Sequence, residues 1–297
     1  MTGRDSVFCF ECQGEPLLGI LSEPPGERQA SGVGVIVIVG GPQYRAGSHR
    51  QFTLLARALA SQGHHCLRFD YRGMGDSPGK THTFIDVEAD VAAAVQSLRR
   101  HCPAVDKVVL WGLCDGASAA LLYLDAAGPA AGVDGLVLLN PWVRSAETLA
   151  KTQVRHYYTQ RLRQKEFWLK LLRGGTGLKA LREFLGKLRT ASASRQRRSG
   201  SGATLTFQDR MARAWSAFQG PVLLLLSGDD YVAKEFQDLV RASPAWSRLV
   251  QGRDTKQHLL EGVDHTFSSA AWRREVEMLT AQWMGASLAA PQRKAGP

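Results

Sequence analysis

Residues 108–118, V-V-L-W-G-L-C-D-G-A-S, join a strand-like run to a helix-like run through a sharp turn. The apolar run at 108–111 is typical of a strand that is covered on both faces of a sheet. Gly112 and Gly116 flank Cys114 two residues away on each side, where a nucleophile in strained backbone geometry needs small neighbours. The helix start behind Cys114 offers free N–H groups and a positive dipole end, which lower a thiol pKa and stabilise an oxyanion. Cys114 is therefore the candidate nucleophile; the alternative is a buried structural cysteine.

Strand-like and helix-like segments alternate on both sides of this turn. Residues 33–39 and 135–139 are short apolar runs, whereas 51–61 and 86–100 have apolar residues at helical spacing. The alternation predicts an α/β fold with a doubly wound, mostly parallel sheet and helices on both faces. The other predicted strands are 7–12, 16–22, 64–69, 107–111, 221–227 and 257–261, and the other predicted helices are 117–124, 234–241 and about 268–284.

The alternation is interrupted at residues 143–216, which follow the sixth predicted core strand. Two segments there, 166–172 and 178–188, have amphipathic helical patterns, and no strand pattern occurs. The Ser/Arg/Gly-rich stretch at 191–202 predicts a flexible loop. We therefore expect a core domain made of 1–142 and 217–285, a helical insertion at 143–216, and a disordered tail at 286–297.

The positive charge of the chain is concentrated in this insertion. Residues 144–198 hold 15 Lys and Arg against three Glu, a net +12, whereas the rest of the chain holds 22 basic and 24 acidic residues. The charge is either a solvated basic face or a docking surface for an anionic membrane or an acyl carrier. No nucleic-acid-binding motif accompanies it, which argues against a nucleic-acid partner.

Targeting and cysteine patterns favour a cytoplasmic protein, with association at a membrane surface as an alternative. No uninterrupted apolar stretch is as long as a transmembrane helix, and residues 1–13 lack the apolar run of a secretory signal. The five cysteines are an odd number in a chain too large to need disulfides, so we expect free thiols. Cys9 and Cys12 form a C-x-x-C without a second ligand pair, which argues against a zinc site.

The turn around Cys114 and the surrounding alternation resemble the α/β-hydrolase superfamily, with Cys in the usual place of Ser as in dienelactone-hydrolase-like members. The resemblance spans almost the whole chain. It implies an α/β-hydrolase fold in which the insertion after the sixth strand is a helical lid. The D-x-R-G-x-G-x-S pattern at 70–77 matches the superfamily turn after the fourth strand, and we expect it to be structural.

The resemblance also implies the partners of Cys114. The superfamily histidine corresponds to His265, in a loop between the last strand and last helix, and would act as the base. The superfamily acid corresponds to Asp230 in G-D-D-Y at 228–231. Asp229 is the second choice, because the interval from Gly228 to the aspartate is one residue shorter here than in the usual superfamily pattern G-x-x-D. The nucleophile, acid and histidine then follow one another in the superfamily order.

The oxyanion site needs two N–H donors. The resemblance to α/β-hydrolases implies that one donor is the backbone N–H of Asp115. The other donor would lie in the loop at 40–44, which begins with Gly40 where most relatives have His. Pro42 has no N–H, so Gly41 or Gln43 must donate, and Gln43 is favoured.

Several stretches are similar to a narrower family, the exosortase A system-associated hydrolase 1 family of exopolysaccharide-producing Gram-negative bacteria. These stretches are G-G-P-Q-Y-R-A-G-S-H-R-Q-F at 40–52, W-G-L-C-D-G-A-S-A-A-L at 111–121 and S-G-D-D-Y-V-A-K-E-F at 227–236. The similarity implies that Arg45, Ser48, His49 and Arg50 line the pocket entrance, and that the enzyme acts in exopolysaccharide biosynthesis.

A Cys-His-Asp set predicts a hydrolase or acyltransferase that acts on esters or thioesters through an acyl-enzyme. The substrate would be a small or lipid-linked acyl compound, and the chemistry needs no metal and no organic cofactor. The alternative is a non-catalytic accessory protein that docks at a membrane or a synthase complex through its basic insertion.

Overall fold

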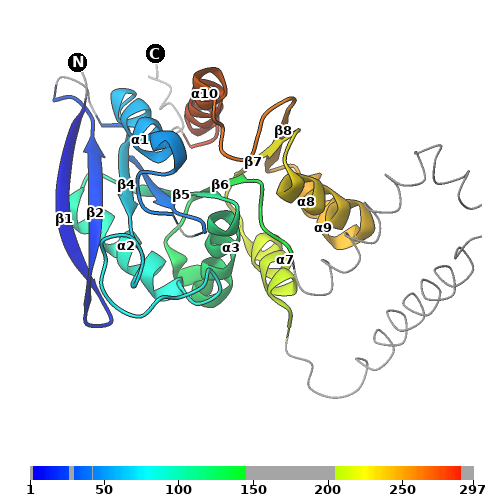
Figure 1. The fold of residues 1–297 in the computed structure, drawn as a ribbon, viewed down its shortest axis with the longest axis horizontal. Coiled ribbons are helices and arrows are strands. Elements are labelled where there is room, and N and C mark those ends of the chain that lie inside the picture. Colours follow the sequence, from blue (N-terminus) through cyan, green and yellow to red (C-terminus); the bar gives the residue numbers. More distant parts are fainter. Residues whose placement is uncertain (1–2, 27–29, 42, 145–204, 289–297) are drawn as a thin grey trace, which may run out of the picture. The chain divides into compact units, whose positions relative to one another are not determined.

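The computed structural model describes residues 3–26, 30–41, 43–144 and 205–288. The chain divides into two compact units, of which the first contains Met1–Val143 and Phe207–Pro297 and the second contains Arg144–Thr206. The first unit holds the sheet and the helices described below (Figure 1). The expected helical lid and its basic face lie largely outside the described residues.

The first unit is built on one eight-stranded sheet with the order β1-β2-β4-β3-β5-β6-β7-β8. β1 and β2, and β2 and β4, pair antiparallel, whereas all other neighbours are parallel. This is the α/β-hydrolase fold predicted from the sequence. The strands are β1 Arg4–Cys12, β2 Glu15–Glu23, β3 Val33–Ile38, β4 His65–Phe69, β5 Lys107–Leu113, β6 Gly135–Leu139, β7 Val222–Ser227 and β8 Thr255–Leu260.

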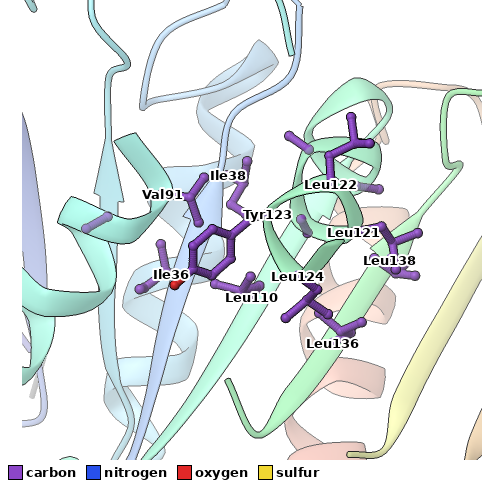
Figure 2. Close-up of a cluster of buried hydrophobic side chains, with 14 of the residues drawn as sticks. Ile36, Ile38, Val91, Leu110, Leu121, Leu122, Tyr123, Leu124, Leu136 and Leu138 are labelled. Atoms are coloured by element: carbon purple, nitrogen blue, oxygen red, sulfur yellow. The ribbon is translucent and has the colours of Figure 1, made fainter. Parts of the chain in front are cut away.

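Helices cover both faces of the sheet, which is why every residue of β3, β6 and β7 is buried. α1 (Gln51–Ser61) and α10 (Ala270–Ser287) pack with each other and on one face. The opposite face carries α2 (Glu88–His101) and α3 (Asp115–Ala127). Figure 2 shows part of this second core, a cluster in which Ile36 and Leu110 of the strands are drawn around Tyr123 of α3, and Leu138 near Leu121. The same side carries α7 (Phe207–Ala217), α8 (Tyr231–Ala242) and α9 (Pro244–Val250).

The first unit resumes at Phe207, earlier than the core boundary expected at 217. α7 packs against α3, and Met211 and Trp215 of α7 are buried in the core. Arg210 fixes the helix further, because its guanidinium pairs with Glu88 at 3.0 Å and with Asp125 at 2.9 Å. Residues 207–216 therefore belong to the unit that holds the sheet.

The end of the chain also differs from the expectation of a disordered tail from 286. α10 continues to Ser287, and Leu288 is buried in the core with 5% of its surface exposed. The Leu288 carbonyl accepts a hydrogen bond of 2.8 Å from Lys107 Nζ. The prediction was wrong for 286–288, and residues 289–297 lie outside the described residues. Within the described part of the chain, no helix combines the length and apolar character needed to span a bilayer.

Candidate active site

Cys114 occupies the strained turn predicted for it. It lies between β5 and α3 with φ 62° and ψ −125°, a backbone conformation that costs a non-glycine residue about 1–3 kcal/mol. The flanking glycines make the turn sterically possible: a Cβ on Gly112 would lie 2.5 Å from the Ala117 nitrogen, and one on Gly116 would lie 2.4 Å from the Ile38 carbonyl oxygen. Because β5 is an interior strand, the turn holds the half-buried thiol at the carboxyl edge of the sheet.

The neighbouring strand β6 holds this turn in place. The Cys114 N–H donates to the Leu139 carbonyl at 2.9 Å, and the Cys114 carbonyl accepts from the Trp142 N–H at 3.2 Å. Ser118 Oγ, in the first turns of α3, donates to the Trp142 carbonyl at 2.7 Å. The segment after β6 is therefore bonded to both sides of the nucleophile turn.

Two further residues at the same edge were not singled out by the sequence, Asn140 after β6 and Ser227 at the end of β7. Asn140 Nδ2 donates to Ser227 Oγ at 2.9 Å, and the Ser227 N–H donates to Asn140 Oδ1 at 2.8 Å. Both residues are fully buried, and Asn140 has φ 45°, which asparagine tolerates better than most residues. This pair ties the strand beside the nucleophile to the strand that leads to Asp229 and Asp230.

Asp230 and His265 meet across the edge of the sheet. His265 Nδ1 lies 2.8 Å from Asp230 Oδ2, and the Asp230 side chain is 4% exposed. Asp230 is also the N-cap of α8, where its carboxylate accepts from the Val232 N–H at 3.0 Å. Asp229 is exposed, and its N–H donates to the Val263 carbonyl. Of the two candidate acids, the structure places Asp230 against the imidazole.

This environment favours a protonated imidazole. The hydrogen bond with Asp230, followed by the interaction with the Cys114 side chain, raises the pKa of His265 to about 10, although burial opposes the charge. A carboxylate held on Nδ1 leaves Nε2 for the nucleophile side. An imidazolium beside a thiol stabilises the thiolate, which is the reactive form.

The predicted oxyanion donors lie on two segments near the nucleophile. Asp115 is the first residue of α3, and Gly41 and Gln43 lie in the loop after β3. The Gly41 N–H acts on the Asp115 carboxylate and lowers its pKa, although burial of this group raises the pKa overall. The second donor stays the prediction made from the sequence, with Gln43 favoured over Gly41. Gln43 Oε1 is itself buried without a hydrogen-bond partner among the described residues.

The residues expected at the pocket entrance are placed differently from one another. The Arg45 guanidinium forms ion pairs with Asp70 and, at 2.6 Å, with Asp76. The Arg45 N–H also donates to Asp70 Oδ1 at 2.7 Å. Arg45 therefore braces the loop after β3 against the 70–77 turn, in addition to any contact with a substrate. His49 and Arg50 are exposed, with φ 52° and 59° in the short 3-10 turn Ser48–Arg50 just before α1, and Ser48 is partly buried.

No group of three His, Cys, Asp or Glu side chains gathers as metal ligands within the part of the chain that the structure describes. Cys9 is exposed, whereas Cys12, Cys66 and Cys102 are buried, and all are free thiols. Burial raises the pKa of Cys66 to about 12 and that of Cys102 to about 11. Of the five cysteines, Cys114 is the one whose side chain contributes to the raised pKa of His265.

Several solved structures share this fold at low sequence identity. An esterase from Pyrococcus furiosus is 15% identical with a TM-score of 0.63, over 96% of this chain and 92% of its own. Est1E from Butyrivibrio proteoclasticus, solved with ferulic acid bound, is 15% identical with a TM-score of 0.60, over 95% of this chain and 100% of its own. An α/β serine hydrolase homologue from Coxiella burnetii is 17% identical with a TM-score of 0.54, over 95% of this chain and 97% of its own. No curated protein sequence matches the chain.

At these identities the structural likeness establishes the fold alone. The family is established by sequence, because residues 35–277 match the family model described as "Alpha/beta hydrolase family". The matched range contains the Cys114 turn, Asp230 and His265. The chain therefore belongs to the α/β-hydrolase family.

Proposed function

We propose that this protein is a hydrolase or acyltransferase that acts on ester or thioester bonds, with Cys114 as nucleophile, His265 as base and acid, and Asp230 as the group that orients His265. The observation that carries the proposal is the buried Asp230 carboxylate, which lies 2.8 Å from His265 Nδ1. The pKa of this imidazole is raised by Asp230 and by the side chain of Cys114, which occupies a strained strand-to-helix turn. Esterases among the structural neighbours are consistent with this chemistry.

The reaction would have two halves. In the first, the Cys114 thiolate attacks the acyl carbon, and the tetrahedral oxyanion is bound by the N–H groups of Asp115 and Gln43. The bond to the leaving alcohol or thiol then breaks, the leaving group takes the proton from His265 Nε2, and a thioester to Cys114 remains. In the second half, His265 removes a proton from water or an acceptor alcohol, whose oxygen attacks the acyl carbon. The bond from that carbon to the Cys114 sulfur then breaks, which releases the acid or the transferred ester and restores the thiolate beside the protonated His265.

A biological setting follows only from the sequence similarity at 40–52, 111–121 and 227–236. We infer from it an acyl substrate, small or lipid-linked, that belongs to exopolysaccharide biosynthesis. The basic segment 144–198 would then attract an anionic acyl carrier or an anionic membrane surface to the enzyme.

The proposal is tested by Cys114→Ala, with Cys9→Ala as the matched control because Cys9 is an exposed free thiol outside the site. With a panel of p-nitrophenyl esters and acyl-coenzyme A thioesters, we expect hydrolysis to be lost in Cys114→Ala and retained in Cys9→Ala. Full activity of Cys114→Ala would exclude it as the nucleophile. If the wild-type protein turns over no substrate but binds anionic vesicles, the alternative of a non-catalytic docking protein is favoured.

A further inference from the structure

The side chain of Asp115, the residue after the nucleophile, is in direct contact with the loop after β3. A Cβ on Gly40 would lie 2.2 Å from Asp115 Oδ1 and 2.4 Å from the Leu113 carbonyl oxygen, so residue 40 has no room for a side chain. On the other side, a Cβ on Gly116 would lie 3.2 Å from the Gly40 nitrogen. The start of α3 and the loop after β3 are therefore packed backbone to backbone, with the Asp115 carboxyl group at their junction.

This carboxyl group is in an unusual electrostatic position. Asp115 Oδ1 is buried and has no hydrogen-bond partner among the described residues. The backbone N–H groups of Gly41 and Gly116 act on the carboxylate and lower its pKa, but burial outweighs them and raises it. The Tyr71 hydroxyl is also buried and has no hydrogen-bond partner within the described part of the chain, and burial, followed by the charge of Asp115, raises its pKa. Leaving a buried acceptor unpaired costs about 1–3 kcal/mol, so a benefit elsewhere is expected.

The expected benefit concerns the oxyanion site, because the start of α3 and the loop after β3 each carry one of its two predicted N–H donors. Asp115 supplies one predicted oxyanion N–H from its own backbone, and the loop supplies the other from Gln43. The Asp115 side chain is the group that contacts the loop at Gly40. A shift of the loop by about 1 Å would remove the second donor from a developing oxyanion, because donors act only near 2.7–3.1 Å.

We propose that Asp115 is a positioning residue for the oxyanion site: its carboxyl group holds the segment Gly40–Gly41 against the start of α3 and thereby places the Gln43 N–H. The role belongs to the packing of the carboxyl group against Gly40, and not to a hydrogen bond of Oδ1 or to a negative charge, which would oppose the charge that forms on the oxyanion. This inference rests on the proposed acyl chemistry at Cys114.

Two reactions of the Cys114 thiol distinguish the positioning role of Asp115 from the role of His265 as base. In alkylation by iodoacetamide, the Cys114 sulfur displaces iodide from a methylene carbon, and no oxyanion forms. In acylation by p-nitrophenyl acetate, the sulfur attacks a carbonyl carbon, an oxyanion forms, and p-nitrophenolate leaves. A defect confined to the oxyanion site slows the second reaction alone, whereas a defect in the thiol, its base or the fold slows both.

For Asp115→Ala we expect acylation to fall about 10- to 100-fold, somewhat less than loss of a whole oxyanion donor, while alkylation stays within about twofold. Asp115→Asn keeps the shape of the side chain and its contact with Gly40 without a charge, and we expect it to recover most of that acylation. Asp254→Ala is the control for removal of a carboxylate: Asp254 is two-thirds exposed just before β8, and we expect neither reaction to change.

The proposal is overturned if Asp115→Ala acylates like the wild-type protein, if Asp115→Asn is as slow as Asp115→Ala, or if both reactions fall together in a variant that is still folded by circular dichroism. If Asp115→Ala does not fold, Asp115→Asn decides alone: near-normal acylation supports the proposal, and slow acylation with normal alkylation refutes it. A wild-type protein that is alkylated at Cys114 but never acylated would instead overturn the proposed function, and this inference with it.

Discussion

Replacing Asp230 by asparagine removes the charge next to His265 while preserving the shape of the side chain. The carboxylate is 4% exposed and lies 2.8 Å from His265 Nδ1, so water screens the interaction little. The oxygen that asparagine retains can still accept from the Val232 N–H and cap α8, where Asp230 Oδ1 now lies at 3.0 Å. The variant therefore perturbs the imidazole far more than it perturbs the fold.

The magnitude follows from the kind of hydrogen bond that is lost. A hydrogen bond to a charged group contributes about 1.5–3 kcal/mol, which corresponds to about 10- to 150-fold in rate. The first cause of the raised His265 pKa disappears, so the imidazole becomes neutral at lower pH and stabilises the thiolate less. We expect kcat/KM for a p-nitrophenyl ester to fall by about this factor, and the rate of Cys114 alkylation at neutral pH to fall with it.

The assay is the rate of ester hydrolysis and of iodoacetamide labelling from about pH 5 to about pH 9, with unfolding by urea measured in parallel. Asp229→Asn is the matched control, since Asp229 is the adjacent aspartate but is exposed. The reasoning fails if Asp230→Asn keeps wild-type rates, or if Asp229→Asn loses them instead.

Two further predictions concern stability. The folded-state pKa of His265 lies above its usual value of 6.5, at about 10, so its stabilisation is complete below about pH 6.5 and is lost as the pH rises toward 10. The difference in unfolding free energy between the wild-type protein and His265→Gln should therefore shrink over that range, by at most about 1.4 kcal/mol per pH unit; a constant or growing difference in urea titrations would contradict this. Asn140→Ala leaves buried groups of Ser227 unpaired, and we expect a loss of about 1–3 kcal/mol. A double-mutant cycle with Ser227→Ala should give a coupling of about 0.5–3 kcal/mol, and additive losses would show that the pair is not coupled.

Much of the core could be predicted from sequence because its signals are local. β3, β6 and β7 are continuous apolar runs that suit strands covered on both faces, and the glycines around Cys114 mark a turn where no side chain fits. α9 was not predicted, since its seven residues, which begin with Pro244, are too few to show a clear helical period. The end of α10 was missed because Leu288 is a single apolar residue whose partner, Lys107, is far away in sequence.

The site was less predictable where the deciding contacts are distant in the chain. Asp229 and Asp230 are adjacent in sequence, and only the backbone bond from Asp229 to Val263 and the capping of α8 by Asp230 turn the second carboxylate toward His265. The ion pairs of Arg45 with Asp70 and Asp76 give it a bracing role that its position in the loop does not reveal. The contact between Asp115 and Gly40 could not be predicted either, because the two residues are far apart in the sequence and neither local pattern indicates the contact.

The central claim is that Cys114 carries the acyl group during turnover. Brief incubation with a p-nitrophenyl or acyl-coenzyme A substrate, acid quenching and peptide mass spectrometry should find the acyl mass on the peptide that contains Cys114. The adduct should be absent from Cys114→Ala and present in Cys9→Ala. Turnover that continues in Cys114→Ala, or an acyl group found on another residue in the wild-type protein, would contradict the account.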